Sequence, residues 1–264
     1  MKKYIVIGNP ISHSLSPKLH NHWLKQNNID ANYDKIKLEE DEIKGIIQDI
    51  KKQKIAGCNI TVPFKKKVIP FLDSLSSEAE KTQSVNTIVF ENGSLVGHNT
   101  DIAGFTKAIE NLQFNVKGKK VFILGAGGVV PSIIFTLNKM GVSEITISNR
   151  TRQKAENFKK EFKNLNILDW GEIPVFDLII NATSLGLKNE EIDLNFNNVG
   201  RNKLFYDVIY NPSETNFLKK GKKLGNYTEN GKLMFVYQAL EAFKLWHGIE
   251  PKVDRETIRV LEND

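Results

Sequence analysis

Short apolar runs alternate with longer amphipathic stretches along the chain, and this alternation is typical of βα units on largely parallel sheets. The N-terminal part shows it in strand patterns over residues 3–8, 32–38 and 56–62, separated by helical patterns over 17–27 and 40–52. Two more strand patterns, 86–90 and 94–98, flank Asn92-Gly93, a dipeptide that favours a tight hairpin turn. We therefore expect an α/β fold whose first sheet is closed by this hairpin.

A helical pattern over 101–112 leads into a second series with the same alternation. This series comprises a helical pattern over 129–140 and strand patterns over 121–124, 144–148, 166–168, 177–181 and 204–209. The last helical pattern, 234–246, is ended by Gly248 and Pro251. We expect two domains, one of residues 1–100 completed by C-terminal helices over 234–264, and one of residues 101–233.

The second series opens with the pattern of a dinucleotide-binding turn. The apolar strand 121–124 runs into Gly125-Ala126-Gly127-Gly128, and a helix with Pro131 in its first turn follows. Glycines let the backbone turn sharply beside a pyrophosphate, and a helix N-terminus offers it N–H donors. Val130 stands where the Gly-x-Gly-x-x-Gly pattern has its last glycine. We expect a Rossmann-type domain here, and a glycine turn in an ordinary βαβ unit is the alternative.

The segment after the second strand of this domain favours NADP over NAD. NAD sites usually place an acidic residue there, on the ribose 2′-hydroxyl. Here the strand is followed by Asn149-Arg150-Thr151-Arg152-Gln153-Lys154, and the first acidic residue is Glu156. Guanidinium and ammonium groups pair with a 2′-phosphate, whereas a carboxylate repels it. A basic helix N-terminus on the surface is the alternative interpretation.

Composition and charge narrow the class of protein. The chain has 264 residues, 40% of them hydrophobic, and a net charge of +6. Its apolar runs are far shorter than the ~18 residues that a membrane span needs. Lysines are spread along the chain in pairs, which indicates solvated helix faces rather than a nucleic-acid surface. The single cysteine, Cys58, excludes an internal disulfide framework. We expect a soluble cytoplasmic protein.

Three polar clusters follow predicted strands of the first domain. They are Gly8-Asn-Pro-Ile-Ser12-His-Ser14-Leu-Ser16-Pro17, Asn59-Ile-Thr61-Val-Pro63-Phe-Lys65 and Gly97-His-Asn99-Thr100-Asp101. Open α/β sheets bind ligands beyond the carboxyl ends of their strands. The alternatives are structural: Ser16 before Pro17 fits a helix N-cap, and Lys65 fits a solvated run of three lysines.

Together these segments strongly resemble the shikimate dehydrogenases, the NADP-dependent enzymes of the aromatic amino-acid (chorismate) pathway. The resemblance covers nearly the whole chain, and its motifs occur in order: the three clusters above, Val85-Asn86-Thr87, Gly-Ala-Gly-Gly, Asn-Arg-Thr, Asn181-Ala-Thr-Ser-Leu-Gly186, Asp207-Val-Ile-Tyr210-Asn-Pro and Gln238-Ala. It implies an N-terminal substrate domain and a Rossmann-type NADP-binding domain. It also implies an oxidoreductase that reduces 3-dehydroshikimate to shikimate with NADPH and needs no metal.

The resemblance assigns roles to individual residues. Lys65 and Asp101 would be the catalytic pair, because an ammonium can protonate the alkoxide that hydride transfer leaves. The substrate residues would be Ser14, Ser16, Thr61, Lys65, Asn86, Asp101, Tyr210 and Gln238, with the two serines on the substrate carboxylate. The cofactor residues would be Gly125, Ala126, Gly127, Gly128 and Val129 at the pyrophosphate, Asn149, Arg150, Thr151 and Lys154 at the adenosine ribose and its 2′-phosphate, and Val208 and Gly231 at the nicotinamide end. The active site is expected in the cleft between the domains.

Two departures from the family pattern concern the cofactor. A small residue and a basic one commonly follow the glycines, where this chain has Val129-Val130-Pro131, and the usual Gly-x-Gly-Met-Leu appears as Gly231-Lys232-Leu233-Met234-Phe235. Two rival functions stay open: a quinate/shikimate dehydrogenase that uses NAD(P), and a non-catalytic relative that senses nucleotides or binds nucleic acid. Monomer and homodimer are both compatible with the sequence.

Overall fold

The computed structural model describes residues 1–262, and the chain divides into two compact units. Unit 1 contains residues 1–104 and the chain from residue 236 onward, and unit 2 contains residues 105–235. The borders fall inside the helices α4 (Asp101–Glu110) and α8 (Lys232–His247). The sequence placed them at 100/101 and 233/234, where helical patterns begin, because a border within a helix leaves no local sequence signal.

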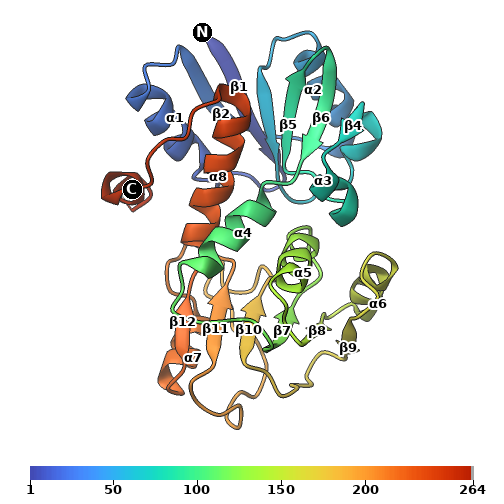
Figure 1. The fold of residues 1–264 in the computed structure, drawn as a ribbon, viewed down its shortest axis with the longest axis vertical. Coiled ribbons are helices and arrows are strands. Elements are labelled where there is room, and N and C mark those ends of the chain that lie inside the picture. The colour runs from blue at the N-terminus through green and yellow to red at the C-terminus, as the bar shows by residue number, and fades with distance from the viewer. Residues whose placement is uncertain (263–264) are drawn as a thin grey trace. The chain divides into compact units, whose positions relative to one another are not determined.

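Unit 1 is built on a six-stranded mixed sheet in the order β2-β1-β3-β5-β6-β4 (Figure 1). Its elements before α4 are β1 (Lys2–Gly8), α1 (Ser16–Gln26), β2 (Ala31–Lys37), α2 (Ile43–Lys51), β3 (Gly57–Ile60), β4 (Ser74–Leu75), α3 (Ser77–Thr82), β5 (Thr87–Glu91) and β6 (Ser94–His98). The β5–β6 hairpin is confirmed, but the prediction that it closes the sheet is wrong. The edge is β4, which pairs with β6 and is too short to show a periodic pattern.

The part of α8 that belongs to unit 1 packs on the sheet of that unit. The Trp246 indole N–H donates to the Ile88 carbonyl at 3.1 Å, and its ring lies 5.0 Å from that of Tyr4. A Cβ on Gly57 would collide with the Trp246 ring, so a glycine in β3 makes room for this contact. The C-terminal part of the chain therefore belongs to the core of unit 1.

Unit 2 contains a six-stranded sheet, all parallel, in the order β12-β11-β10-β7-β8-β9. Its elements are β7 (Lys120–Leu124), α5 (Val130–Lys139), β8 (Glu144–Ser148), α6 (Arg152–Glu156), β9 (Asn166–Leu168), β10 (Leu178–Asn181), β11 (Leu204–Asp207), α7 (Asn216–Lys223) and β12 (Tyr227–Glu229). Counted from β7, this order is 6-5-4-1-2-3, the order of dinucleotide-binding sheets. The predicted Rossmann-type fold is confirmed, and its topological switch point lies between β7 and β10.

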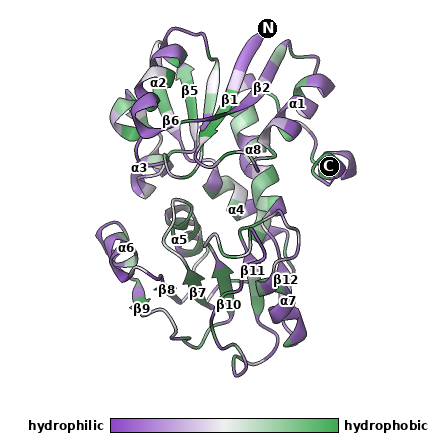
Figure 2. Cartoon of the chain, turned by 180° about the vertical axis from the view of Figure 1, so that it is seen from behind, coloured by the Kyte–Doolittle hydropathy of each residue, from purple (hydrophilic) through white to green (hydrophobic). Residues whose placement is uncertain are grey.

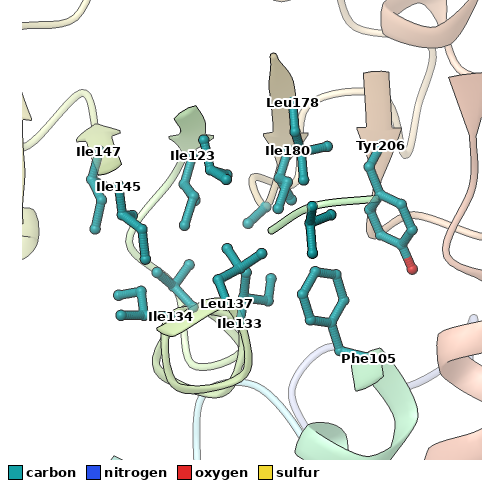
Figure 3. Close-up of a cluster of buried hydrophobic side chains, with 14 of the residues drawn as sticks. Phe105, Ile123, Ile133, Ile134, Leu137, Ile145, Ile147, Leu178, Ile180 and Tyr206 are labelled. Atoms are coloured by element: carbon teal, nitrogen blue, oxygen red, sulfur yellow. The ribbon is translucent and has the colours of Figure 1, made fainter. Parts of the chain in front are cut away.

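Helix α5 covers one face of this sheet with apolar side chains. Figure 3 shows Ile133, Ile134 and Leu137 of α5 facing the strand residues Ile123 and Ile180. All five side chains are 0% exposed, and burying each stabilises the fold by about 1.5–3 kcal/mol. Figure 2 shows β7 and β10 as hydrophobic strands, whereas most of α7 is hydrophilic. A sheet buried on both faces reads as continuous apolar runs, which is why its central strands β7 and β10 were predictable.

Several short elements were not predicted. Among them are α3, α7 and β12, each of at most eight residues. The last helix, α9 (Arg255–Val260), lies in the range 234–264 predicted for C-terminal helices, but its bounds were not predicted. The short helices begin at caps rather than at a long apolar period: Ser76, Thr215 and Asp254 each accept a hydrogen bond from a backbone N–H of the first turn. Among the helices of residues 1–262, none combines the length and the apolar character needed to cross a membrane.

Candidate functional site

The three polar clusters of unit 1 lie at the same edge of its sheet. They follow β1, β3 and β6. β1 and β3 are parallel, and β6 runs in the direction of β3 because β5 is antiparallel to both β3 and β6. The carboxyl ends of all three strands therefore point to one edge, which is where open α/β sheets bind ligands.

Lys65 and Asp101 form a buried ion pair at this edge. Lys65 follows β3 and Asp101 begins α4, and the Lys65 ammonium donates a hydrogen bond to Asp101 Oδ2. The two side chains are 10% and 8% exposed. Burying two charges is costly unless they are paired and hydrogen-bonded, so this pair is a specific arrangement and not one member of a solvated lysine run.

Asn86 ties the ion pair to the rest of the edge. Its Nδ2 group lies 3.0 Å from Asp101 Oδ1, 2.8 Å from Thr100 Oγ1 and 3.4 Å from Gln238 Oε1. Its Oδ1 atom accepts the Thr100 N–H at 2.7 Å. The structure thus brings together Lys65, Asn86, Asp101 and Gln238, all predicted as substrate residues, although 152 positions separate Asn86 from Gln238.

A second buried asparagine, Asn59, was not predicted as a site residue. Its Nδ2 group donates to the Asn86 carbonyl at 3.1 Å and to Thr87 Oγ1 at 2.9 Å, and its Oδ1 accepts the Tyr33 hydroxyl at 2.6 Å. The sequence signal was an amide within the strand pattern 56–62. The structure shows that all four residues of this strand are buried. A buried amide must find partners, so Asn59 extends the network around Asn86.

The serine cluster after β1 differs from the prediction in one respect. Ser16 is the first residue of α1 and Leu15 occupies the N-cap position, so the interpretation of Ser16 as the N-cap is wrong. Ser14 Oγ accepts the Ser16 N–H at 3.3 Å, which makes Ser14 the residue that satisfies a backbone donor there. In the part of the chain that the structure describes, neither serine hydrogen-bonds Lys65 or Asp101.

Two further predicted substrate residues are described by contacts within their own units. Thr61 follows β3 and is half-buried, and its N–H donates to the Ile7 carbonyl at 2.9 Å. Tyr210 belongs to unit 2, where its ring stacks on Phe235 with 4.3 Å between the ring centroids.

The glycine turn of unit 2 lies between β7 and α5, at the switch point of the sheet. Gly125 has φ +107°, and a Cβ there would lie 2.8 Å from the Ala182 carbonyl oxygen. Glycine is therefore required, and the turn leaves the backbone of residues 125–129 close to any group bound above it. Val130, in place of the last glycine, is 0% exposed and packs in the core of unit 2.

The basic segment after β8 contains cations with different partners. Arg152 pairs with Asp169 at 2.7 Å and with Glu156 at 3.2 Å. Arg150 and Lys154 are exposed and, within residues 1–262, take part in none of the ion pairs. Asn149 Nδ2 donates to the Thr151 carbonyl at 2.8 Å and fixes the turn. Arg150 and Lys154 can therefore pair with a phosphate group.

Val208 and Gly231, predicted at the nicotinamide end, lie against each other. A Cβ on Gly231 would collide with the Val208 carbonyl, and the Gly231 N–H donates to the Ile209 carbonyl at 3.1 Å. The departures after Gly231 serve packing: Leu233 contacts the core of unit 2 and Phe235 stacks on Tyr210. They do not alter the close approach at Gly231.

Family models of known proteins match most of the chain. Residues 6–88 match the shikimate dehydrogenase substrate binding domain, residues 106–204 match shikimate / quinate 5-dehydrogenase, and residues 233–255 match the shikimate 5′-dehydrogenase C-terminal domain.

Individual relatives are similar over the whole length of the chain. Shikimate dehydrogenase (NADP(+)) of Pelagibacter ubique is 57% identical over 262 residues, which cover 99% of each protein. The crystal structure of shikimate dehydrogenase from Aquifex aeolicus has a TM-score of 0.92 at 35% identity and covers 100% of this chain and 98% of that one. Shikimate 5-dehydrogenase from Thermus thermophilus, in complex with NADP(H) and shikimate, has a TM-score of 0.88 at 30% identity and covers 99% and 98%.

Proposed function

Because the chain belongs to the shikimate dehydrogenase family, we propose that it catalyses the reversible reduction of 3-dehydroshikimate to shikimate with NADPH. This reaction is a step of aromatic amino-acid (chorismate) biosynthesis. The observation that carries the proposal is the buried pair of Lys65 and Asp101, a proton donor with an anchored partner at the ligand-binding edge of the sheet.

Lys65 and Asp101 carry the proton chemistry. Bound NADPH supplies the hydride that converts the ketone carbon of the substrate into an alkoxide carbon. The Lys65 ammonium then donates a proton to that oxygen, and in the reverse direction the neutral amine accepts it. Asp101 holds the ammonium in place through its hydrogen bond. Asn86 in turn fixes the carboxylate by donating to its second oxygen.

The remaining side chains of the site recognise the substrate. Ser14 and Ser16 bind its carboxylate through their hydroxyl groups, which suit an anion without adding a buried charge. Thr61, Asn86, Gln238 and Tyr210 bind its hydroxyl groups, because amides and hydroxyls can both donate and accept hydrogen bonds.

The residues of unit 2 fit NADPH. Residues 125–129 approach the pyrophosphate, since the space at Gly125 is one that a Cβ would fill. Asn149, Arg150, Thr151 and Lys154 bind the adenosine ribose and its 2′-phosphate, and Val208 and Gly231 contact the nicotinamide end. The cytoplasm is the location that we propose, in keeping with a single cysteine, Cys58, that is buried and not in a disulfide.

The proposal is tested by following NADPH oxidation with the purified chain. We expect oxidation with 3-dehydroshikimate and none without it, a much slower reaction with NADH, and little reduction of NADP⁺ with quinate. Efficient use of quinate with NAD⁺ would favour the broader dehydrogenase. No oxidation, together with salt-dependent binding of nucleic acid, would contradict the enzyme assignment.

A further inference from the structure

Asp207 is a buried carboxyl group at the end of β11 to which none of the roles above applies. It is 0% exposed and accepts three hydrogen bonds, from Asn181 Nδ2 at 3.1 Å, the Ile209 N–H at 3.0 Å and Thr215 Oγ1 at 2.6 Å. All three donors are neutral, and burial raises the pKa of Asp207 to about 6. Keeping a carboxylate in such a place is costly, so the arrangement needs an explanation.

The strand register places Asp207 in one row with the ends of the two neighbouring strands. Paired across the sheet, the row consists of Leu124, Asn181 and Asp207. The next residue along each strand is the first residue of a loop: Gly125, Ala182 and Val208. The Ala182 N–H donates to the Leu124 carbonyl, and the Val208 N–H donates to the Asn181 carbonyl. These hydrogen bonds tie the first residue of each loop to the row. Gly125 and Val208 are two of the proposed cofactor contacts.

On one side, Asp207 acts on the glycine turn through Asn181. The Asn181 amide donates both to Asp207 and to the Leu185 carbonyl at 3.1 Å, and its oxygen accepts the Thr183 N–H and hydroxyl. Asn181 therefore shapes the loop that starts at Ala182. The Ala182 carbonyl lies where it limits the space at Gly125, so a shift of this loop changes the glycine turn.

On the other side, Asp207 fixes the chain that carries Val208. It accepts the Ile209 N–H from its own loop and the Thr215 hydroxyl from the N-cap of α7. The Val208 carbonyl, between Asp207 and Ile209 in the chain, is the atom against which Gly231 packs. Loss of these hydrogen bonds would let Val208 and Gly231 move apart.

We propose that Asp207 is a positioning residue for the cofactor, which holds the glycine turn and the Val208–Gly231 contact at a fixed spacing through Asn181 and Thr215. The inference rests on the proposed function, because that function makes these two places NADPH contacts. When two contact sites are already held at the spacing that the cofactor requires, no free energy is spent on ordering them when the cofactor binds. The affinity for the cofactor is therefore higher.

The test compares Asp207→Asn, Thr215→Val and the control Thr215→Ser with the unaltered chain. Asp207→Asn replaces one accepting oxygen by a donor, and Thr215→Val removes the hydroxyl that Thr215→Ser keeps. Measured by fluorescence titration, the Kd for NADPH should rise roughly tenfold in Asp207→Asn and Thr215→Val, because loops that are no longer held must be ordered when the cofactor binds. The Kd for shikimate in all variants, and the Kd for NADPH in Thr215→Ser, should stay within about twofold of the unaltered chain.

A purely structural role gives a different result. If Tm falls in Asp207→Asn and Thr215→Val while the Kd for NADPH stays unchanged, the positioning role is wrong. If Asp207→Asn does not fold, the comparison of Thr215→Val with Thr215→Ser decides the question alone. An unaltered chain that binds no NADPH overturns the proposed function and this inference together. An unaltered chain that binds NADPH, beside variants that bind it equally well, overturns this inference only.

Discussion

The two units prepare for their ligands in different ways. In unit 1, side chains from distant parts of the sequence meet in a buried hydrogen-bond network, with Asn86 between Asp101 and Gln238. In unit 2, the residues proposed for the cofactor contribute backbone shape, as at Gly125, or exposed charge, as at Arg150. A network of side chains fails when one member is removed, whereas a backbone turn tolerates changes such as Val129-Val130-Pro131. We therefore expect substitutions of the buried network in unit 1 to impair chemistry, and substitutions of the cofactor residues in unit 2 to impair NADPH affinity.

The largest effect is expected at Lys65. Lys65→Ala removes the proton donor and should lower kcat by about 10² to 10⁴, with much smaller changes in the binding of substrate and NADPH. Lys65→Met keeps much of the aliphatic length and should be equally slow if the ammonium itself acts. Steady-state kinetics at saturating substrate measure both.

A neighbouring lysine serves as the control for this effect. Lys67 is two positions further along and pairs with Glu40 at the surface. Lys67→Ala should leave kcat unchanged, because an exposed ion pair contributes little. Equal losses in Lys65→Ala and Lys67→Ala would show that the charge of the lysine run matters and not the buried pair.

The two units should also respond to acid with opposite sign. His20 in unit 1 is 1% exposed and stacks on Tyr33 with ring centroids 4.2 Å apart, and burial, with a contribution from His247, lowers its pKa to about 3. The unfolded chain therefore binds a proton at His20 below pH ~6.5 that the folded chain does not bind. The stability due to neutral His20 is complete above that pH and is lost as the pH falls.

The titration of Asp207 in unit 2 has the opposite effect on the pH dependence of stability. Since its pKa is raised to about 6 in the folded chain, the folded state binds the proton more tightly, and stability is lost as the pH rises from ~4 to ~6. Between pH 4 and pH 6.5, each group changes the free energy of unfolding by about 3 kcal/mol. In urea denaturation between pH 4 and pH 6.5, His20→Phe should flatten the loss of stability in acid and Asp207→Asn should steepen it. Changes of the same sign in both variants would contradict the burial argument.

A smaller effect is expected at Arg150. Arg150→Ala removes a charge-assisted pair worth about 1.5–3 kcal/mol, so KM for NADPH should rise roughly tenfold or more while KM for NADH changes little. Arg152→Ala is the matched control, because Arg152 is already paired with Asp169 and Glu156. It should leave the ratio of the two KM values unchanged. Equal losses for NADPH and NADH in Arg150→Ala would contradict the 2′-phosphate assignment.

The smallest effect is expected at the serine cluster. Ser14→Ala or Ser16→Ala should each weaken shikimate binding by about 1 kcal/mol, the usual worth of one hydrogen bond, and leave NADPH binding unchanged. Ser12→Ala, in the same loop but exposed, is the control. Titration calorimetry with shikimate measures all three. Unchanged affinity for shikimate in Ser14→Ala and Ser16→Ala would show that both serines have only a structural role.

The fold was more predictable from the sequence than the network in unit 1. The central parallel strands of unit 2 could be predicted because they are apolar runs, such as Val121–Leu124, whereas the edge strand β12 (Tyr227–Glu229) is polar and was not predicted. The edge strand β4 could not be predicted, because two residues have no period. The partners of Asn59 are 26 to 28 positions away, and such contacts leave no local pattern. The N-cap of α1 is Leu15 and not the predicted Ser16, since a serine before a proline fits both the N-cap and the first helical residue.

The central claim is that Lys65 and Asp101 act as one unit at the reacting oxygen, and a double-mutant cycle on kcat tests it most directly. Lys65→Ala, Asp101→Asn and the double variant are compared with the unaltered chain at saturating 3-dehydroshikimate and NADPH. We predict that both single variants are slow and that the double variant is about as slow as the slower single one, because removing either partner already disables the pair. Losses that multiply in the double variant, or a Lys65→Ala variant that keeps most of its kcat, would contradict the claim.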